Sequence, residues 1–231
     1  MYKKNFAYLL VCLFFVAIII SACKGGKSNP PTTTVSPTPK PTQTIAPTPT
    51  PATSNSFTNA NVGDYIKLGT YPQTAEGEIQ PIEWLVLKRE GNQILLISKY
   101  GLEPRNFDKN SNNWGTSEIR QWLNGEFYDK AFSENEKKYI KSSDDNVFLL
   151  SKTDVLNYFA NEEARKCKPT EYAKAKGATV DDNGYTNWWL NYPDTNGSGN
   201  VYRIVYNGDF GYYENVWGEH DVARPALWIT F

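Results

Sequence analysis

Apolar and polar positions alternate in the first strongly patterned stretch of this chain, and the alternation predicts a β-hairpin. Ile82, Trp84 and Val86 fall at every second position, so they share one face of a strand. Turn residues 90–92 follow, and then a continuous apolar run, 94–97, which is typical of a buried strand.

The spacing then changes to that of helices, and four are predicted. The first begins at Thr116 or Ser117, and its apolar positions are Ile119, Trp122, Leu123 and Phe127. The starting signals of the others are Ser133 with Glu136, Ser151 with Asp154, and Thr170 before a stop at Gly177. In the third helix, the spacing predicts that Val155, Leu156 and Phe159 face inward.

The C-terminal part returns to short strands. The expected strands are 188–190, 200–206, 210–213 and 226–230, with a turn at 207–209. Helices clustered between two sets of strands are typical of an α+β fold. We therefore expect a mixed, mainly antiparallel sheet with a cluster of short helices.

The N-terminus has the pattern of a secretory signal. Two lysines precede an apolar run, 6–20, which is short for a membrane span. The run closes on Ile-Ser-Ala-Cys at 20–23, which resembles the lipobox of bacterial lipoproteins. The resemblance implies that residues 1–22 are removed and that Cys23 is lipidated. The alternative is a plain signal peptide, or an uncleaved anchor, with a chance cysteine.

A stalk is predicted between Cys23 and a globular domain at 57–231. Residues 28–56 are mostly Pro, Thr and Ser, so they cannot bury enough surface to fold. Repeated Thr-Pro favours extended polyproline II structure. Segment 23–56 is therefore expected to be a lipidated, disordered spacer. It would hold the domain outside the bacterial cytoplasmic membrane. Two or three acyl chains anchor a protein firmly, because each buried methylene contributes roughly 0.8 kcal/mol to membrane binding.

The charge of residues 57–231 argues against nucleic acid as a partner. The chain has 24 basic and 25 acidic residues, and five lysines but no acidic residue precede Phe57, which leaves 19 against 25 and a net charge of −6. The sequence also contains no basic stripe. The same charge argues against direct binding to anionic lipid or teichoic acid by bulk charge.

Several blocks of the sequence resemble a known family. They are "LGTYPQT" at 68–74, "PIEWLVL" at 81–87, "LLISKYGL" at 95–102, "IRQWLNGEFYDKAFSENEKKYI" at 119–140, "VFLLS" at 147–151, "TEYAKAKGA" at 170–178, "WWL" at 188–190 and "RPALWI" at 224–229. Together they resemble a bacterial extracytoplasmic family that is defined only as domain of unknown function 6273. The resemblance implies a cell-surface module, often carried on lipoproteins, with no known activity.

A more distant resemblance is to C-type-lectin-like folds, including the formylglycine-generating-enzyme group. A tryptophan-rich strand, a loop, a hairpin and a closing Arg-Pro strand support it. That group's chemistry uses cysteines near the C-terminal end, and no cysteine follows Cys167 here. The usual family pattern after the Trp pair is Leu-Arg-Ser-Pro-Gly, whereas this chain has Asn191 where the Arg would stand. If that arginine serves a ligand in relatives, this chain has lost it.

Catalytic signals are weak. A Ser or Cys nucleophile needs a base, and the single histidine, His220, lies between Glu219 and Asp221 without a nucleophile motif. We expect a surface or hinge histidine. Cys167 is the only cysteine of the domain, so it forms no disulfide there and is expected to be partly buried and unreactive. One histidine and one cysteine do not favour zinc.

Two polar stretches raise the question of calcium. Residues 194–199 place oxygen-bearing side chains at alternate positions like the first half of an EF-hand loop, but the twelfth position is Val205 and not Glu. Residues 108–112 show the same alternation. Asn, Asp and Gly also build ordinary turns, so we expect no cofactor, with calcium as the less favoured alternative.

The pair Trp188-Trp189 and the loop behind it suggest a ligand site. Successive strand residues point to opposite faces, so we expect one Trp to be buried and the other to lie near the surface or under a helix. Exposed aromatic rings can stack on sugars, whereas buried rings contribute to core packing. For most of the aromatic residues around this loop, we favour the packing role. Arg224 is expected to pair with a buried acid rather than with a ligand. The candidate ligand-binding residues are Trp189, Asn191, Tyr192, Asp194, Asn196, Trp217 and Arg224.

The favoured function is a non-enzymatic, lipid-anchored module that binds a cell-wall or extracellular glycan, or another protein. The first alternative is a surface carbohydrate-active enzyme, which would place two carboxylates about 5–10 Å apart in a cleft. The second is a structural or sensing subunit of the envelope, which would show a large exposed apolar patch in place of a cleft.

Overall fold

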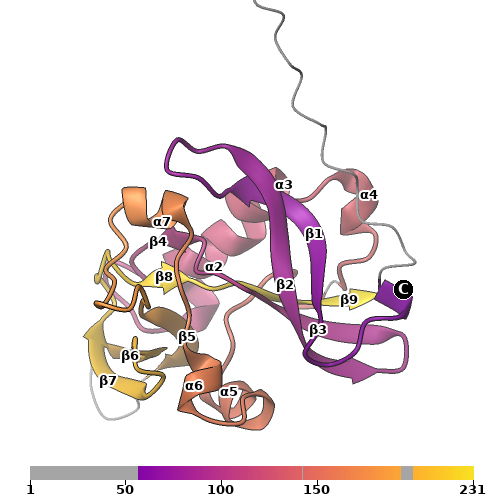
Figure 1. Cartoon of the computed structure of the whole chain (residues 1–231). Helices are drawn as coiled ribbons and strands as arrows, with labels where there is room; N and C mark the ends of the chain where they lie inside the picture. The colour runs from indigo at the N-terminus through magenta and orange to yellow at the C-terminus, as the bar shows by residue number, and fades with distance from the viewer. Residues whose placement is uncertain (1–56, 142, 194–199) are drawn as a thin grey trace, which may run out of the picture. The chain divides into compact units, whose positions relative to one another are not determined.

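Two β-sheets with short helices beside them make up the described part of the chain (Figure 1). The computed structural model describes residues 57–141, 143–193 and 200–231, with the backbone alone for 212–214. The expected signal segment, the lipidated Cys23 and the stalk lie outside these residues, so the domain boundaries after residues 22 and 56 stay predictions.

Contacts divide the chain into two units, Met1–Ala46 and Pro47–Phe231, and every described residue belongs to the second. None of the helices in the described ranges combines the length and the apolar character that crossing a bilayer requires.

The first sheet contains the predicted hairpin and the C-terminal strand. Its order is β1-β2-β3-β9, and all pairings are antiparallel. The strands are β1 (Tyr65–Pro72), β2 (Ile79–Glu90), β3 (Gln93–Ser98) and β9 (Ala226–Thr230). Strands β2 and β3 confirm the hairpin. Gly91 in the turn has a φ of 57°, a left-handed conformation that glycine adopts without strain.

The second sheet has the order β4-β8-β5-β6-β7. Its strands are β4 (Glu103–Pro104), β8 (Val222–Ala223), β5 (Trp188–Pro193), β6 (Asn200–Ile204) and β7 (Phe210–Asn215). Only the β5–β8 pairing is parallel, and the others are antiparallel. The fold is α+β, with antiparallel pairing dominant, as the order of elements in the sequence predicted.

The helices are short and begin where capping residues stand. They are η1 (a 3₁₀-helix, Trp114–Thr116), α2 (Glu118–Trp122), η2 (a π-helical turn, Leu123–Phe127), α3 (Tyr128–Ala131), α4 (Glu134–Lys137), α5 (Lys152–Tyr158), α6 (Glu162–Arg165) and α7 (Glu171–Ala175). The side chains of Ser117, Ser133, Ser151 and Thr170 each accept a hydrogen bond from the backbone amide three residues later. All four predicted helix starts are confirmed.

Two hydrophobic cores lie on opposite faces of the inner strands. Residues 94–97 of β3 alternate between these cores, and so do Trp188 and Trp189 of β5. Because successive side chains of a strand point to opposite faces, both strands must be covered on both sides. The continuous apolar run in β3 therefore packs as the sequence predicted.

The differences from the predicted elements are local. Leu156 is 54 % exposed, although Val155 and Phe159 are buried. Helix α5 has only seven residues, so its buried stripe is narrower than the spacing suggested, and the inward prediction for Leu156 is wrong. Strand β1 has no counterpart among the predictions, because its register shifts between Lys67 and Thr70 and the shift interrupts the alternation.

Candidate functional site

A polar groove is lined by the β1–β2 hairpin and by the segment that leads into α7. The hairpin loop and α7 lie near each other at the upper left of Figure 1. It has a volume of about 610 Å³, and three parts of the chain line it: the hairpin between Lys67 and Glu83, Tyr100, and segment 168–174. Backbone hydrogen bonds fix this approach, since Tyr172 N donates to Gln73 O at 3.1 Å and Gly101 N donates to Lys168 O at 3.0 Å. Contacts between distant segments therefore build the groove.

Both carboxylates of the groove already hold a lysine. Glu83 Oε2 accepts a hydrogen bond from Lys99 Nζ at 2.9 Å, and this bond raises the pKa of Lys99. Glu171 Oε1 accepts one from Lys174 Nζ at 2.6 Å. The acidic side chains are thus neutralised within the protein.

Two further lysines of the groove have no carboxylate partner in the described ranges. Lys67 stands on the exposed side of β1. Lys168 Nζ lies 5.1 Å from the centroid of the Tyr185 ring, which attracts a cation without neutralising it. These two ammonium groups give the groove a positive charge.

Neutral hydrogen-bonding groups complete the lining. They include the amides of Gln73 and Gln80, the Tyr100 side chain and the Thr170 hydroxyl. Thr170 Oγ1 accepts a hydrogen bond from Ala173 N at 3.0 Å, and its own proton remains for donation. Such a lining suits a hydrated ligand better than an apolar one.

A smaller hollow of about 430 Å³ lies beside Tyr206. The side chains of Asp181 and Asn187 are used within the protein. Asp181 Oδ1 accepts hydrogen bonds from Asn183 N and Tyr185 N at 3.0 and 2.7 Å, and Asn187 Oδ1 accepts one from Tyr206 N at 2.9 Å. This hollow therefore offers fewer groups to a ligand than the groove does.

Both tryptophans of the pair are buried, each with a relative exposure of 0 %. Trp188 Nε1 donates to Arg165 O at 3.1 Å, and Trp189 Nε1 donates to Arg105 O at 2.7 Å. We expected one of them near the surface or under a helix, and neither lies near the surface, because β5 has a core on each side. Trp189 presents neither its ring nor its N–H group to solvent, so its prediction as a ligand-binding residue is also wrong.

Arg224 is a structural residue. It is 3 % exposed, and its Nε donates to Ser98 O at 3.0 Å while its Nη1 donates to Arg165 O at 3.3 Å. Its guanidinium carbon also lies 4.9 Å from the Trp188 ring centroid. We expected Arg224 to pair with a buried acid, but its partners are carbonyl oxygens and an aromatic ring. The prediction that Arg224 binds a ligand is also wrong, because the side chain is buried.

Three other candidates are at least partly accessible. Tyr192 and Trp217 are 38 % and 62 % exposed, and Asn191 is half-buried. The Tyr192 ring packs edge-on against Tyr202 with 5.3 Å between the centroids. The roles proposed for Asn191, Tyr192 and Trp217 stay predictions.

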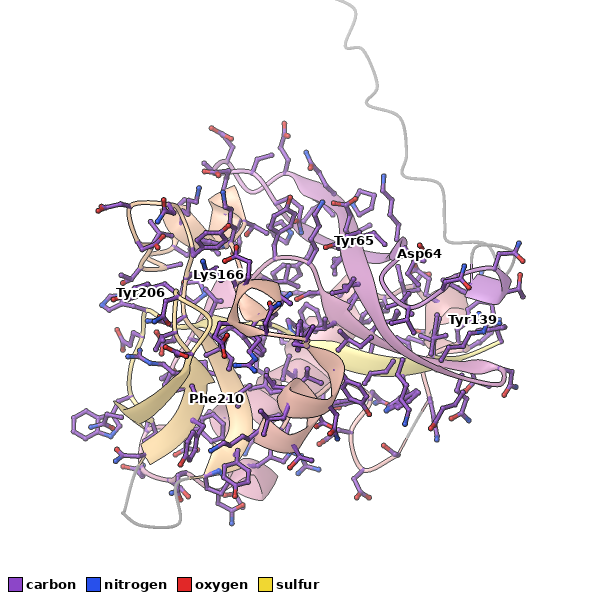
Figure 2. All side chains as sticks on the ribbon, turned by 60° about the horizontal axis from the view of Figure 1, so that its bottom comes forward. Asp64, Tyr65, Tyr139, Lys166, Tyr206 and Phe210 are labelled. Atoms are coloured by element: carbon purple, nitrogen blue, oxygen red, sulfur yellow. The ribbon has the colours of Figure 1, made fainter. Side chains whose placement is uncertain are left out.

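Other exposed aromatic rings are spread over the molecule. Tyr65 on β1 and Tyr206 beyond β6 are 53 % and 50 % exposed, and Figure 2 shows them in separate parts of the structure. A pair so far apart cannot form one stacking platform.

Of the two stretches considered for calcium, 108–112 forms an ordinary turn. Asp108 Oδ1 accepts hydrogen bonds from Asn110 N and Ser111 N at 2.7 and 2.9 Å, and Oδ2 accepts one from Glu118 N at 3.1 Å. Where side chains are described, no group of three or more His, Cys, Asp or Glu residues gathers to hold a metal. The stretch 194–199, which includes the candidates Asp194 and Asn196, lies outside the described residues.

His220 and Cys167 have surroundings that do not favour nucleophilic catalysis. His220 is exposed, with Nδ1 3.0 Å from Gly177 O. Its neighbour Asp221 pairs instead with Arg203 Nη1 at 2.7 Å. Cys167 is 2 % exposed, and burial raises the pKa of its thiol, which disfavours the reactive thiolate.

Sequence reasoning missed the groove. None of its lining residues was a candidate, because lysine, glutamate and glutamine are common on every protein surface. The available signal was weak: polar residues such as Lys67, Gln80 and Glu83 form the outward side of the hairpin. Only the folded chain brings them against segment 168–174.

The chain belongs to a family defined by a domain of unknown function. The family model DUF6273 matches residues 91–231, which is more than half of the 231 residues. This match confirms the family that the sequence blocks resemble. No curated protein matches the chain, and no solved structure matches it. The matched range includes Tyr100 and segment 168–174 of the groove, whereas the lining residues of the hairpin precede it.

Proposed function

We propose that this chain is a lipid-anchored cell-surface module that binds a glycan of the cell wall or the extracellular space in the polar groove. The groove of about 610 Å³, lined by amide, hydroxyl and ammonium groups, carries the proposal. The N-terminal pattern supports its location: lipid on Cys23 would anchor the chain on the outer face of the bacterial cytoplasmic membrane, and residues 23–56 would act as the stalk.

The lining supports a hydrated ligand. Sugar hydroxyls exchange hydrogen bonds with amides and hydroxyls, and Tyr100 adds a ring that can pack against a sugar. A structural envelope subunit is supported less well, because it would bury a broad apolar face. The most exposed apolar residues of the described chain, such as Val62, Leu156 and Trp217, belong instead to different segments.

An enzyme that uses paired carboxylates is also supported less well. Such an enzyme needs one carboxyl group to donate a proton and another to act at the sugar or on water. Glu83 and Glu171 line the groove, but each is engaged by a lysine within 2.9 Å. The groove is therefore better suited to holding a ligand than to cleaving it.

The test is a glycan array and a pull-down on isolated peptidoglycan with residues 57–231, with and without calcium. Both cores are built from these residues. We expect Gln80→Ala and Tyr100→Ala to weaken binding about tenfold each. The matched controls are Asn157→Ala and Tyr65→Ala, which change an exposed amide residue and an exposed tyrosine outside the groove lining.

Other outcomes would redirect the proposal. Loss of binding in Asn191→Ala or Asp194→Ala alone would place the site at Asn191 or in segment 194–199 instead of the groove. Dependence on calcium would support a bound metal. If the folded domain binds neither the glycan array nor peptidoglycan, glycan binding is contradicted and a surface protein is left as the partner.

A further inference from the structure

We propose that the ligand of the groove carries negatively charged oxygen groups, carboxylate or phosphate, along a polymer. This inference rests on the proposed function and specifies its ligand class. It begins with the pairing of charges. Glu83 and Glu171 each hold a lysine, at 2.9 and 2.6 Å. Lys67 and Lys168 line the same groove without a carboxylate partner in the described chain.

The two unneutralised lysines come from different walls of the groove. Lys67 belongs to β1, and Lys168 belongs to the segment before α7. Both side chains line one concave surface, where the surrounding protein focuses the positive potential. A polymer that passes between the walls can meet both charges.

This local charge is opposite in sign to that of the domain. Residues 57–231 carry a net charge of −6, which predicts no bulk attraction to anions. However, exposed charges are screened beyond about 8 Å at physiological ionic strength. The attraction of an anion to the groove therefore depends on Lys67 and Lys168 rather than on distant acidic residues. The groove can bind anions even though the net charge of the domain predicts no attraction to them.

Neutral donors next to the lysines also suit negatively charged oxygens. The Thr170 hydroxyl has a proton to donate, and the amide of Gln80 lines the same groove. A lysine ammonium is a compact charge with three rotatable donors, so it holds a carboxylate or a phosphate without a fixed bidentate geometry. The geometry thus defines the shared chemistry, and the choice between the two anions is left to experiment.

The test is calorimetric titration of the full-length chain in detergent with three defined polymers. Polygalacturonate supplies carboxylates, poly(glycerol phosphate) supplies phosphates, and dextran is neutral. We expect one or both anionic polymers to bind more tightly than dextran, and increasing NaCl concentration to weaken that binding. The double variant Lys67→Gln/Lys168→Gln should lower the affinity about tenfold.

A matched double variant separates the groove from net charge. Lys138 and Lys141 donate to the amide oxygens of Asn135 and Gln93, at 2.9 and 3.2 Å, and neither lines the groove. Lys138→Gln/Lys141→Gln removes the same charge, and we expect it to keep the affinity of the unmodified chain. Equal losses in both double variants would overturn the inference, because bulk charge would then explain binding.

Binding to peptidoglycan distinguishes failure of the inference from failure of the proposed function. If dextran binds as well as the anionic polymers, and Tyr100→Ala abolishes this binding, the groove binds glycans and the inference about charge is wrong. If peptidoglycan binds but neither anionic polymer does, the inference again fails and the function stands. If peptidoglycan and all three polymers fail to bind, the proposed function fails and the inference fails with it.

Discussion

Strand β5 and the groove beside the β1–β2 hairpin use their residues in opposite ways. Trp188 and Trp189 belong to a residue type that often holds sugars, yet both are fully buried and both N–H groups are bonded to carbonyl oxygens. The groove contains lysine, glutamate and glutamine, which are ordinary on a surface. A side chain is available to a ligand only where the fold leaves it exposed, so residue type alone points to the wrong region here.

The largest expected effect is on the buried tryptophans. Trp189→Ala removes a ring from the core that also contains Ile94 and Leu96. It should lower the free energy of unfolding by about 3–5 kcal/mol, measured by urea denaturation. The control is Trp217→Ala, whose 62 % exposed side chain should change that free energy by about 0.5 kcal/mol or less. Unchanged stability in Trp189→Ala together with lost binding would restore Trp189 as a ligand residue.

Arg224 should give the second largest effect. Arg224→Met keeps an apolar stem beside Trp188 but leaves Ser98 O without the donor that now lies at 3.0 Å. We expect the free energy of unfolding to fall by about 1–3 kcal/mol. Lys138→Met, on the surface, serves as the control. A variant that loses ligand affinity at full stability would contradict the structural role.

Tyr71 allows the comparison to be sharpened with pH. Its hydroxyl donates to a carboxylate oxygen of Glu103, and burial together with this bond raises the pKa of the phenol. Tyr71→Phe should lower the free energy of unfolding by about 1–2 kcal/mol at neutral pH, measured by urea denaturation.

The same tyrosine predicts a loss of stability in alkali. The unfolded chain ionises near the ordinary tyrosine value of about 10, whereas the folded protein keeps the phenol neutral to higher pH. The contribution of Tyr71 is therefore complete below that value and is lost as pH rises above it. Tyr71→Phe should show a smaller alkaline loss, although Tyr128 and Tyr172 retain part of it because burial also raises their pKa. An identical alkaline curve would exclude Tyr71 as its source.

The smallest effect on stability is expected in the groove. Lys67→Gln and Lys168→Gln remove charges that have no carboxylate partner in the described chain, so each should change the free energy of unfolding by about 0.5 kcal/mol or less. Thermal unfolding measures this directly. A large destabilisation by either variant would mean that the lysine stabilises the fold. The groove would then not differ from β5 in how its residues are used.

Local signals predicted much of the fold. Ser117, Ser133, Ser151 and Thr170 mark helix starts because their oxygens bond nearby amides. The β2–β3 hairpin was readable because its turn and its alternation lie within a few residues. Strand β1 was not, since its bulge interrupts the pattern. Leu156 was misplaced because spacing gives a direction on a helix but not the extent of the surface that covers it.

The candidate site was much less predictable. The groove needs the hairpin, Tyr100 and segment 168–174 together, and no local pattern states which distant segments meet. The status of Trp189 likewise depends on the cores that cover both faces of β5. Asn191, Tyr192 and Trp217 remain accessible, so their roles await the binding tests.

By itself, the sequence determined the helix starts, the hairpin, the α+β class and the family, because these depend on residues close together in the chain or on ordered blocks of sequence. It also predicts a signal segment, lipidation at Cys23 and a stalk, and these stay predictions. Only the tertiary structure decided that both tryptophans are interior and that Arg224 bonds to carbonyl oxygens. It also decided that Lys67 and Lys168, which have no carboxylate partner in the described chain, line one groove. Burial and charge pairing are properties of surfaces in contact, and those contacts join segments that are far apart in the sequence.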